Sequence, residues 1–158
     1  ISKWLPVAVR EPDNLVARGA MLVGSCLAGI AFLKGLGHVH AISHMIDAEF
    51  NTQHGLTNAI ILPVVLRFNL PGMEDKVKRM GEAMELEDLS VEDFITEIER
   101  RLDEIDIPRS LSEISVPKGC EERIARKALL DSAARTNPRA ASLAEMCLLV
   151  KTSLNKAR

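Results

Sequence analysis

The sequence has few aromatic residues, with no tyrosine, one tryptophan and four phenylalanines among 158 residues. Proteins that bind single-stranded nucleic acid stack its bases on aromatic rings, and this chain has too few rings for such a surface. An excess of basic charge is also missing, because 20 Lys and Arg residues are interspersed with 22 Asp and Glu residues and the net charge is −2. We therefore expect no nucleic-acid partner.

Cysteine is scarce as well. Cys26, Cys120 and Cys147 are far apart in the sequence and form no Cys-x-x-Cys pair, so the chain lacks both a disulfide framework and a thiolate zinc site. Unpaired cysteines of this kind behave as small apolar core residues. We expect three buried thiols in a reducing compartment, which predicts a cytoplasmic protein.

No uncharged run is long enough for a membrane span. The longest covers residues 19–33, whereas a bilayer requires about 20 residues. Because this run is rich in Gly and Ala, we expect it to form the most buried helix of the core, and we expect no membrane partner. No signal peptide precedes it, and the chain opens on Ile1, which suggests that an upstream part of the polypeptide is absent.

The alternation of polar and apolar residues that is typical of strands is also missing. Apolar residues recur instead with the 3.6-residue period of a helix, which predicts an all-α, multi-helix, bundle-like fold with residues 1–158 in one helical domain. The expected helices are one from about Pro12 to Ile30, a short one at 40–48, one at 55–68 bent at Pro63, one at 73–84, one capped by Ser90 and Asp93, one at 118–135 and one capped by Ser142 and Glu145.

All four histidines lie between residues 38 and 54. His40 and His44 are spaced i, i+4, which places both imidazoles on one face of a helix, and a loop could return His54 to the same place. Asp47 and Glu49 fall on other faces of that helix, so the nitrogen ligands have no obvious carboxylate partner and a complete iron or zinc site does not follow. Metal binding, proton transfer and a crowded helix end all remain open.

Two neighbouring features have simpler interpretations. His38 lies two residues before His40, and side chains at i and i+2 do not share a helical face, so we expect a solvated loop residue. Asn137-Pro138-Arg139 could be a binding turn, but it is more typical of a helix stop followed by a proline turn. The sequence places no base beside a serine or cysteine, so nucleophilic catalysis has no support.

Two segments resemble the signature of the iron-containing (group III) alcohol dehydrogenases. Residues 37–44, GHVHAISH, match the pattern Gly-x-x-His-Ala-x-x-His, and residues 54–63, HGLTNAIILP, match His-Gly-x-x-Asn-Ala-Ile-x-Leu-Pro. A third segment, ARKALLDSAARTNPRAAS, is similar to the family's Ala…Asp…Asn-Pro-Arg stretch near the C-terminus. The similarity extends from NLVARGAMLVGSCLAGIAF to the last helix and therefore covers nearly the whole chain.

The resemblance implies a place for this chain in a larger enzyme. Members of the family have an N-terminal α/β domain that binds NAD or NADP and a C-terminal helical domain that supplies metal ligands, with the active site between the two. This chain resembles the helical domain. His40 and His54 match two ligands of the family's Fe²⁺, for which Zn²⁺ is the alternative, and His44 matches a histidine beside nicotinamide and substrate, in proton transfer or cofactor positioning.

The family's other two ligands, in an Asp-x-x-x-His segment, would lie upstream of Ile1. With two of four ligands and no cofactor domain, the resemblance implies a chain that is inactive alone but belongs to a two-domain enzyme. That enzyme would transfer hydride reversibly between an alcohol or aldehyde and NAD or NADP, and would form a homo-oligomer. The alternatives are a non-catalytic helical interaction module derived from such an enzyme and an independent structural zinc site.

Overall fold

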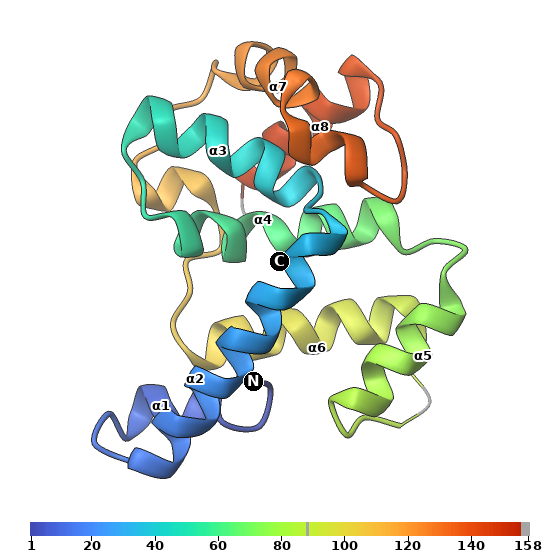
Figure 1. Ribbon diagram of the computed structural model, residues 1–158. Coiled ribbons are helices and arrows are strands. Elements are labelled where there is room, and N and C mark those ends of the chain that lie inside the picture. Colours follow the sequence, from blue (N-terminus) through green and yellow to red (C-terminus); the bar gives the residue numbers. More distant parts are fainter. Residues whose placement is uncertain (88, 156–158) are drawn as a thin grey trace.

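The computed structural model describes residues 1–87 and 89–155 (Figure 1). Within them the α-helices are α1 (Leu5–Arg10), α2 (Leu15–Ala31), α3 (His38–Phe50), α4 (His54–Asn69), α5 (Glu74–Ala83), α6 (Val91–Glu104), α7 (Glu121–Leu130) and α8 (Leu143–Leu154). Three 3-10 helices, η1 (Phe32–Lys34), η2 (Leu111–Ile114) and η3 (Ser132–Thr136), complete the described elements. No strand occurs in these two ranges, so the all-α prediction is confirmed.

Helix α4 lies at the centre of the arrangement, between α3 and α6 in Figure 1. It packs against α3, α6 and α8, while α3 also contacts α7 and η3, and α7 packs against α8. The main core consists of apolar side chains from these helices that are fully buried, among them Ile42, Ile61, Ile124 and Met146. Burial of each such side chain stabilises the fold by about 1.5–3 kcal/mol, so the α3–α4 pair is held firmly from the side of α7 and α8.

Local signals in the sequence define several helix ends correctly. Ser90 and Ser142 each accept a hydrogen bond from the backbone N–H three residues later, at 3.1 Å and 3.2 Å, and both expected capping boxes are complete. The first long helix instead begins at Leu15, because Asn14 caps it by accepting from the backbone N–H of Ala17. The short helix α1 was not expected, since six residues are too few to display a helical period.

The prediction of one continuous helix over residues 118–135 is wrong. The backbone of Asp131 is extended, with ψ 141°, and separates α7 from η3. The Asp131 carboxylate accepts a hydrogen bond from the backbone N–H of Ala133 at 2.7 Å and thereby starts η3. Aspartate often caps a helix in this way, because its side chain satisfies a free backbone donor.

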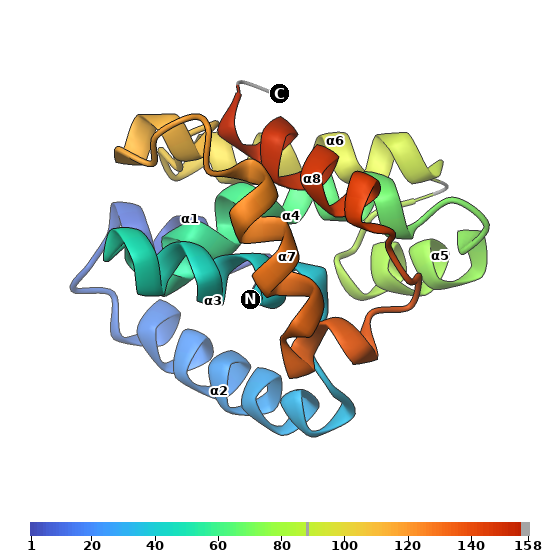
Figure 2. The same ribbon diagram turned by 90° about the horizontal axis from the view of Figure 1, so that it is seen from above.

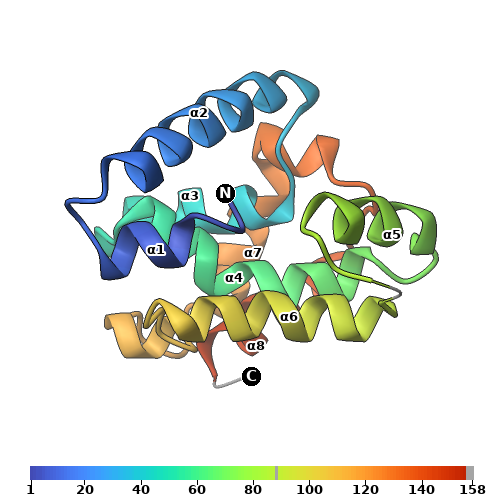
Figure 3. The same ribbon diagram turned by 90° about the horizontal axis from the view of Figure 1, so that it is seen from below.

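Helix α2 contradicts the expectation that it would be the most buried helix. Figures 2 and 3 show it along one side of the molecule, where its packing partners are α1 and η1. Ala17 is its one buried residue, whereas most of its large apolar side chains are exposed, namely Leu15, Val16, Leu22, Val23, Leu27 and Ile30. The side chain of Ile1 also lies against Gly24, but most of the apolar surface of α2 is exposed among the described residues. Periodicity predicts a helix but not its neighbours.

Two further expectations change with α2. Together with η1 it forms a 20-residue segment, Leu15–Lys34, that is long and apolar enough to cross a membrane by length and composition alone. Core helices of water-soluble proteins can have the same length and composition, so these two properties do not show whether lipid or protein covers the exposed side chains of α2. Cys26 is exposed because it lies on this helix, whereas Cys120 is buried and Cys147 half-buried; all three are free thiols.

Candidate functional site

The turn between α3 and α4 brings three histidines together. Only three residues, 51–53, connect the helices, and Asn51 adopts the left-handed conformation with φ 54°, which ends α3 sharply. The ring centroid of His54 then lies 5.3 Å from that of His40 and 5.6 Å from that of His44, and the His40 and His44 centroids are 5.8 Å apart. The prediction that a loop returns His54 to the first pair is therefore confirmed.

The opposite face of α3 fixes this cluster in place. Ala41, Ile42 and Ile46 are fully buried in the main core, so the helix cannot rotate without exposing them. His40 and His44 consequently lie on the partly open face, with the His44 side chain 36% exposed and that of His54 49% exposed. A small ligand can reach the three imidazoles from solvent.

Two carboxylates hydrogen-bond the imidazoles of His44 and His54, each at Nδ1. The His54 Nδ1 donates to Asp47 Oδ2 at 2.6 Å, and the His44 Nδ1 donates to Asp131 Oδ2 at 3.1 Å. Thr52 Oγ1 in turn donates to the other oxygen of Asp47 at 2.6 Å. A carboxylate only accepts, so it keeps the proton on Nδ1 and leaves the Nε2 lone pair free, as a metal ligand or a proton acceptor requires.

The expectation that Asp47 falls on another face of the helix than His40 and His44 is wrong. Asp47 lies three residues after His44 and seven after His40, a spacing that places all three on one face of α3, and its carboxylate accepts from His54, which lies beyond the turn. Asp131 comes from a segment 87 residues after His44. It lies within ARKALLDSAARTNPRAAS, one of the stretches that resemble the family signature, so the motif contains this residue although spacing gives it no role.

The side chain of Asn58 joins two of the imidazoles. Asn58 lies one turn after His54 on α4, and its Nδ2 is 3.0 Å from His54 Nε2 and 3.4 Å from His40 Nε2. Both Nε2 atoms therefore face one small region. Burial lowers the pKa of His40, the positive charges that His54 and His44 can carry lower it further, and Asp131 and Asp47 oppose this shift; the neutral form that results is the one that binds metal.

Two converging imidazoles, each with Nε2 free to bind when the ring is neutral, fit part of the coordination sphere of a divalent transition metal. Iron and zinc sites in proteins usually take three or four protein ligands, and within residues 1–87 and 89–155 no three His, Cys, Asp or Glu side chains are arranged to hold a metal ion. The donor set is thus chemically suitable but incomplete. His40 and His54 can supply two ligands, and any further ligands must come from outside the described residues or from small molecules.

His38 differs from its expected position in a solvated loop. It is the first residue of α3 and is 1% exposed, its Nε2 donates to the backbone carbonyl of Arg139 at 3.0 Å, and its backbone N–H donates to Asn137 Oδ1 at 3.0 Å. Burial lowers the pKa of His38. The Asn137-Pro138-Arg139 turn is therefore a structural clamp on the start of α3, and a contact between residues about 100 positions apart leaves no local signal in the sequence.

A glycine permits this close approach. A Cβ atom on Gly37 would lie 2.8 Å from Asn137 Oδ1, which is shorter than any carbon–oxygen contact that a side chain tolerates without moving its neighbour. The contact with Asn137 thus explains why the GHVHAISH motif has glycine at position 37. Displacement of the clamp would shift the start of α3 and with it His40.

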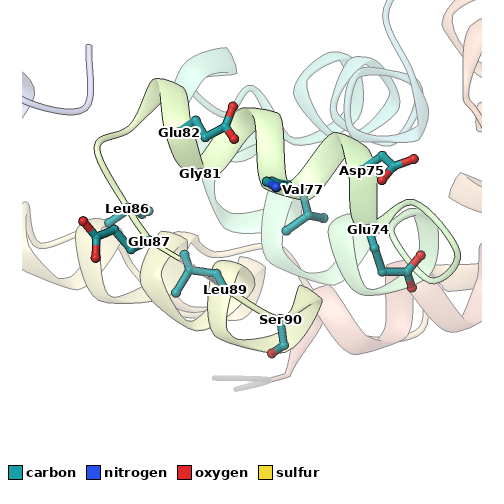
Figure 4. A pocket seen from close by; sticks show the side chains of 10 residues that line it. Glu74, Asp75, Val77, Gly81, Glu82, Leu86, Glu87, Leu89 and Ser90 are labelled. Atoms are coloured by element: carbon teal, nitrogen blue, oxygen red, sulfur yellow. The ribbon is translucent and has the colours of Figure 1, made fainter.

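Two cavities in the described residues are large enough for a small substrate. One of about 380 Å³ adjoins His40 and Asn58 and has apolar walls that include Leu36, Leu62 and Leu66. Another of about 520 Å³, shown in Figure 4, lies between α5 and the segment that leads to α6, and its four carboxylates, Glu74, Asp75, Glu82 and Glu87, are spread around it. The second cavity has no histidine in its walls, so the candidate functional site is the histidine cluster with the first cavity beside it.

Known proteins are similar to this chain in sequence and in fold. Residues 1–154 match the sequence profile of the Fe-containing alcohol dehydrogenase family, C-terminal. "Probable alcohol dehydrogenase EutG" of Escherichia coli (strain K12) is 35% identical over 147 residues, which are 92% of this chain and 37% of that protein. The "NAD-dependent methanol dehydrogenase" of Bacillus methanolicus is 32% identical over 161 residues, which are 98% of this chain and 42% of that protein.

A solved structure agrees with this similarity. The crystal structure of a 1,3-propanediol oxidoreductase superposes with a TM-score of 0.92 and 33% sequence identity, covering 97% of this chain and 42% of that one. This chain thus spans about two fifths of the length of the relatives that it matches.

Proposed function

This chain belongs to the Fe-containing alcohol dehydrogenase family, as its C-terminal helical domain, and on this basis we propose that it is the metal-binding half of an NAD- or NADP-dependent alcohol dehydrogenase. One observation carries the proposal beyond family membership. The Nε2 atoms of His40 and His54 face the same small region, and the Nδ1 of His54 is held by a carboxylate. This arrangement is suited to a divalent metal and incomplete without further ligands.

We assign the metal ligands of this chain as His40 and His54, for Fe²⁺ with Zn²⁺ as the alternative. A divalent metal bound there would supply a Lewis acid for the alcohol or aldehyde oxygen. The remaining ligands and the nicotinamide-binding domain would come from the part of the polypeptide that precedes this chain in its longer relatives. Alone, residues 1–158 would therefore bind metal weakly and would not transfer hydride.

His44 is assigned to proton transfer and cofactor positioning. Asp131 fixes its Nδ1 at 3.1 Å, so Nε2 is the ring nitrogen that can accept or return a proton. Its side chain is 36% exposed, which leaves room for a nicotinamide or substrate beside it. An imidazole titrates near neutral pH and is the usual side chain for this task.

Several properties of the whole enzyme are inferred from its relatives. The name of the Bacillus methanolicus protein includes NAD dependence and methanol, which supports a small primary alcohol as substrate. The exposed apolar side chains of α2 are then covered by protein from the rest of the enzyme rather than by lipid. Free cysteines support a cytoplasmic location, and we expect the two-domain enzyme to form a homo-oligomer.

Metal analysis of variants tests the ligand assignment. In the intact polypeptide that carries this chain, His40→Ala and His54→Ala should each remove most of the bound iron or zinc and most of the alcohol-dependent reduction of NAD or NADP. His44→Ala should retain the metal and lose turnover. Lys151→Ala, exposed on α8 and remote from the cluster, is the matched control. Wild-type metal content in His40→Ala would refute the assignment, and metal loss in His44→Ala would make His44 a ligand.

A non-catalytic interaction module is the alternative, and the exposed apolar surface of α2 is the observation that favours it. Such a surface could bind a partner protein instead of an upstream domain. The intact mass of the polypeptide in its source cell separates the two. A mass of roughly twice 17.4 kDa or more indicates an upstream domain of ordinary size and supports the enzyme. A mass near 17.4 kDa supports the module.

A further inference from the structure

Asn58 occupies a position that neither the metal assignment nor the proton-transfer assignment explains. Its amide nitrogen contacts the Nε2 atoms of His54 and His40 at 3.0 Å and 3.4 Å. Its Oδ1 is buried and has no hydrogen-bond partner among the described residues. A buried carbonyl oxygen without a partner costs about 1–3 kcal/mol, so this orientation of the amide must be compensated by the two contacts of its nitrogen.

The direction of these hydrogen bonds follows from Asp47. Its carboxylate can only accept, so it requires the proton of His54 on Nδ1. The Nε2 of neutral His54 is then an acceptor and needs a donor, which the NH₂ group of Asn58 provides. The same NH₂ group has a second proton, which it directs to His40 Nε2, and that nitrogen must therefore also be an acceptor.

His40 depends on this contact more than His54 does. The His54 ring is held at both nitrogens, by Asp47 and by Asn58. For the His40 ring, Asn58 is the hydrogen-bonding partner that the structure provides. Without it, neutral His40 would be free to take the Nε2–H form that imidazoles in water favour, which leaves no lone pair on Nε2.

We propose that Asn58 is a positioning residue that fixes the tautomer of His40. Asp47 makes Nε2 of His54 an acceptor, so the NH₂ group of Asn58 is oriented toward the two histidines and donates to Nε2 of both. This donation keeps the Nε2 lone pair of His40 available. A hydrogen-bonded chain thus runs from Thr52 through Asp47, His54 and Asn58 to His40. The importance of this lone pair for metal binding rests on the proposed function. The tautomer itself does not.

Nitrogen-15 NMR of the histidine rings measures the tautomer directly. The experiment uses the intact polypeptide, freed of metal by a chelator, at about pH 8, where imidazoles with an ordinary pKa near 6.5 are neutral. In the wild type we expect both His40 and His54 to be protonated at Nδ1. In Asn58→Leu, which removes the donor at similar size, His40 should change to Nε2–H while His54 stays protonated at Nδ1, because Asp47 remains.

Two more variants complete the design. Asn58→Asp preserves the size of the side chain but offers only acceptors, so it should convert His40 to Nε2–H even if the leucine variant fails to fold. Asn155→Leu is the matched control, since its amide donates to the backbone carbonyl of Lys151 at 2.6 Å, far from the cluster, and the His40 signals should not move.

Two results would overturn the proposal. One is an Nε2–H form of His40 in the wild type, and the other is a His40 tautomer that neither Asn58 variant changes. The NMR samples contain no metal or cofactor. They can therefore fail while the His40→Ala metal analysis succeeds, or succeed while that analysis fails.

Discussion

Replacing Asn137 with alanine should lower the free energy of unfolding by about 2–4 kcal/mol. The Asn137 side chain forms four hydrogen bonds: it accepts from the backbone N–H of His38 at 3.0 Å and from Asn69 Nδ2 at 3.0 Å, and it donates to Asn69 Oδ1 and to the backbone carbonyl of Arg139, both at 2.7 Å. Each such bond contributes a net of about 0.5–1.5 kcal/mol. Because Asn137 is half-buried, the lower part of this range per hydrogen bond applies, and the four bonds together give about 2–4 kcal/mol.

Denaturant unfolding followed by far-ultraviolet circular dichroism measures this loss. The midpoint should decrease while the slope stays constant, which indicates a change in stability alone. Asn155→Ala, with one hydrogen bond from an exposed side chain, is the control and should cost less than about 1 kcal/mol. The double variant with Asn69→Ala should be less unstable than the sum of the two single variants, by about 0.5–3 kcal/mol, because the two side chains share bonds.

A loss below about 0.5 kcal/mol, the level of an ordinary surface substitution, would refute the clamp between α3, α4 and the 137–139 turn. Strict additivity with Asn69→Ala would refute it as well, because a shared pair of hydrogen bonds must show coupling. If the clamp holds, the variant should also lose metal affinity in the intact polypeptide, since α3 begins at His38 and carries His40 two residues later.

Two further predictions concern helix ends and acid stability. Ser142→Ala removes the cap of α8 and should cost about 1 kcal/mol in denaturant unfolding, with the exposed Ser132→Ala as control; an unchanged midpoint would contradict the capping box. Arg123 and Lys127 on α7 hold the pKa of Glu49 below its usual value, so Glu49 stabilises the fold at pH values above about 4.5 and this contribution disappears as the pH falls. Glu49→Gln should therefore flatten the loss of stability below pH 4.5, and an identical pH profile would contradict the ion pair.

The parts of the site that the sequence predicts are those close together in the chain. His40 and His44 share a face because they are one turn apart, and His54 returns because a turn of three residues joins two helices. Ser90 and Ser142 cap their helices by contacts with the residue three positions on. In each case the determining interaction lies within a few residues, where spacing and residue type are informative.

The parts that the sequence does not predict depend on contacts between distant segments. His38 is buried by Phe68 and Arg139, and the ring centroids of His38 and Phe68 are 5.9 Å apart. Asp131 reaches His44 across 87 residues. Helix α2 shows the reverse case, because its apolar composition predicts burial but the described residues provide no neighbour for most of its surface.

The placement of the proposed ligands would link metal binding to the assembly of the proposed enzyme. His40 and His54 lie on one helical hairpin whose buried face is fixed by the main core, so this half of the site forms without the metal. Two imidazoles hold a divalent ion weakly, and tight binding needs the further ligands that the proposed upstream segment would supply. Metal affinity then depends on correct contact between two parts of the polypeptide. Under this proposal, Leu27→Glu, a substitution on the exposed apolar face of α2, should lower the metal content of the intact polypeptide although Leu27 is not one of the proposed ligands. An unchanged metal content would refute the link between the covering of α2 and the metal site.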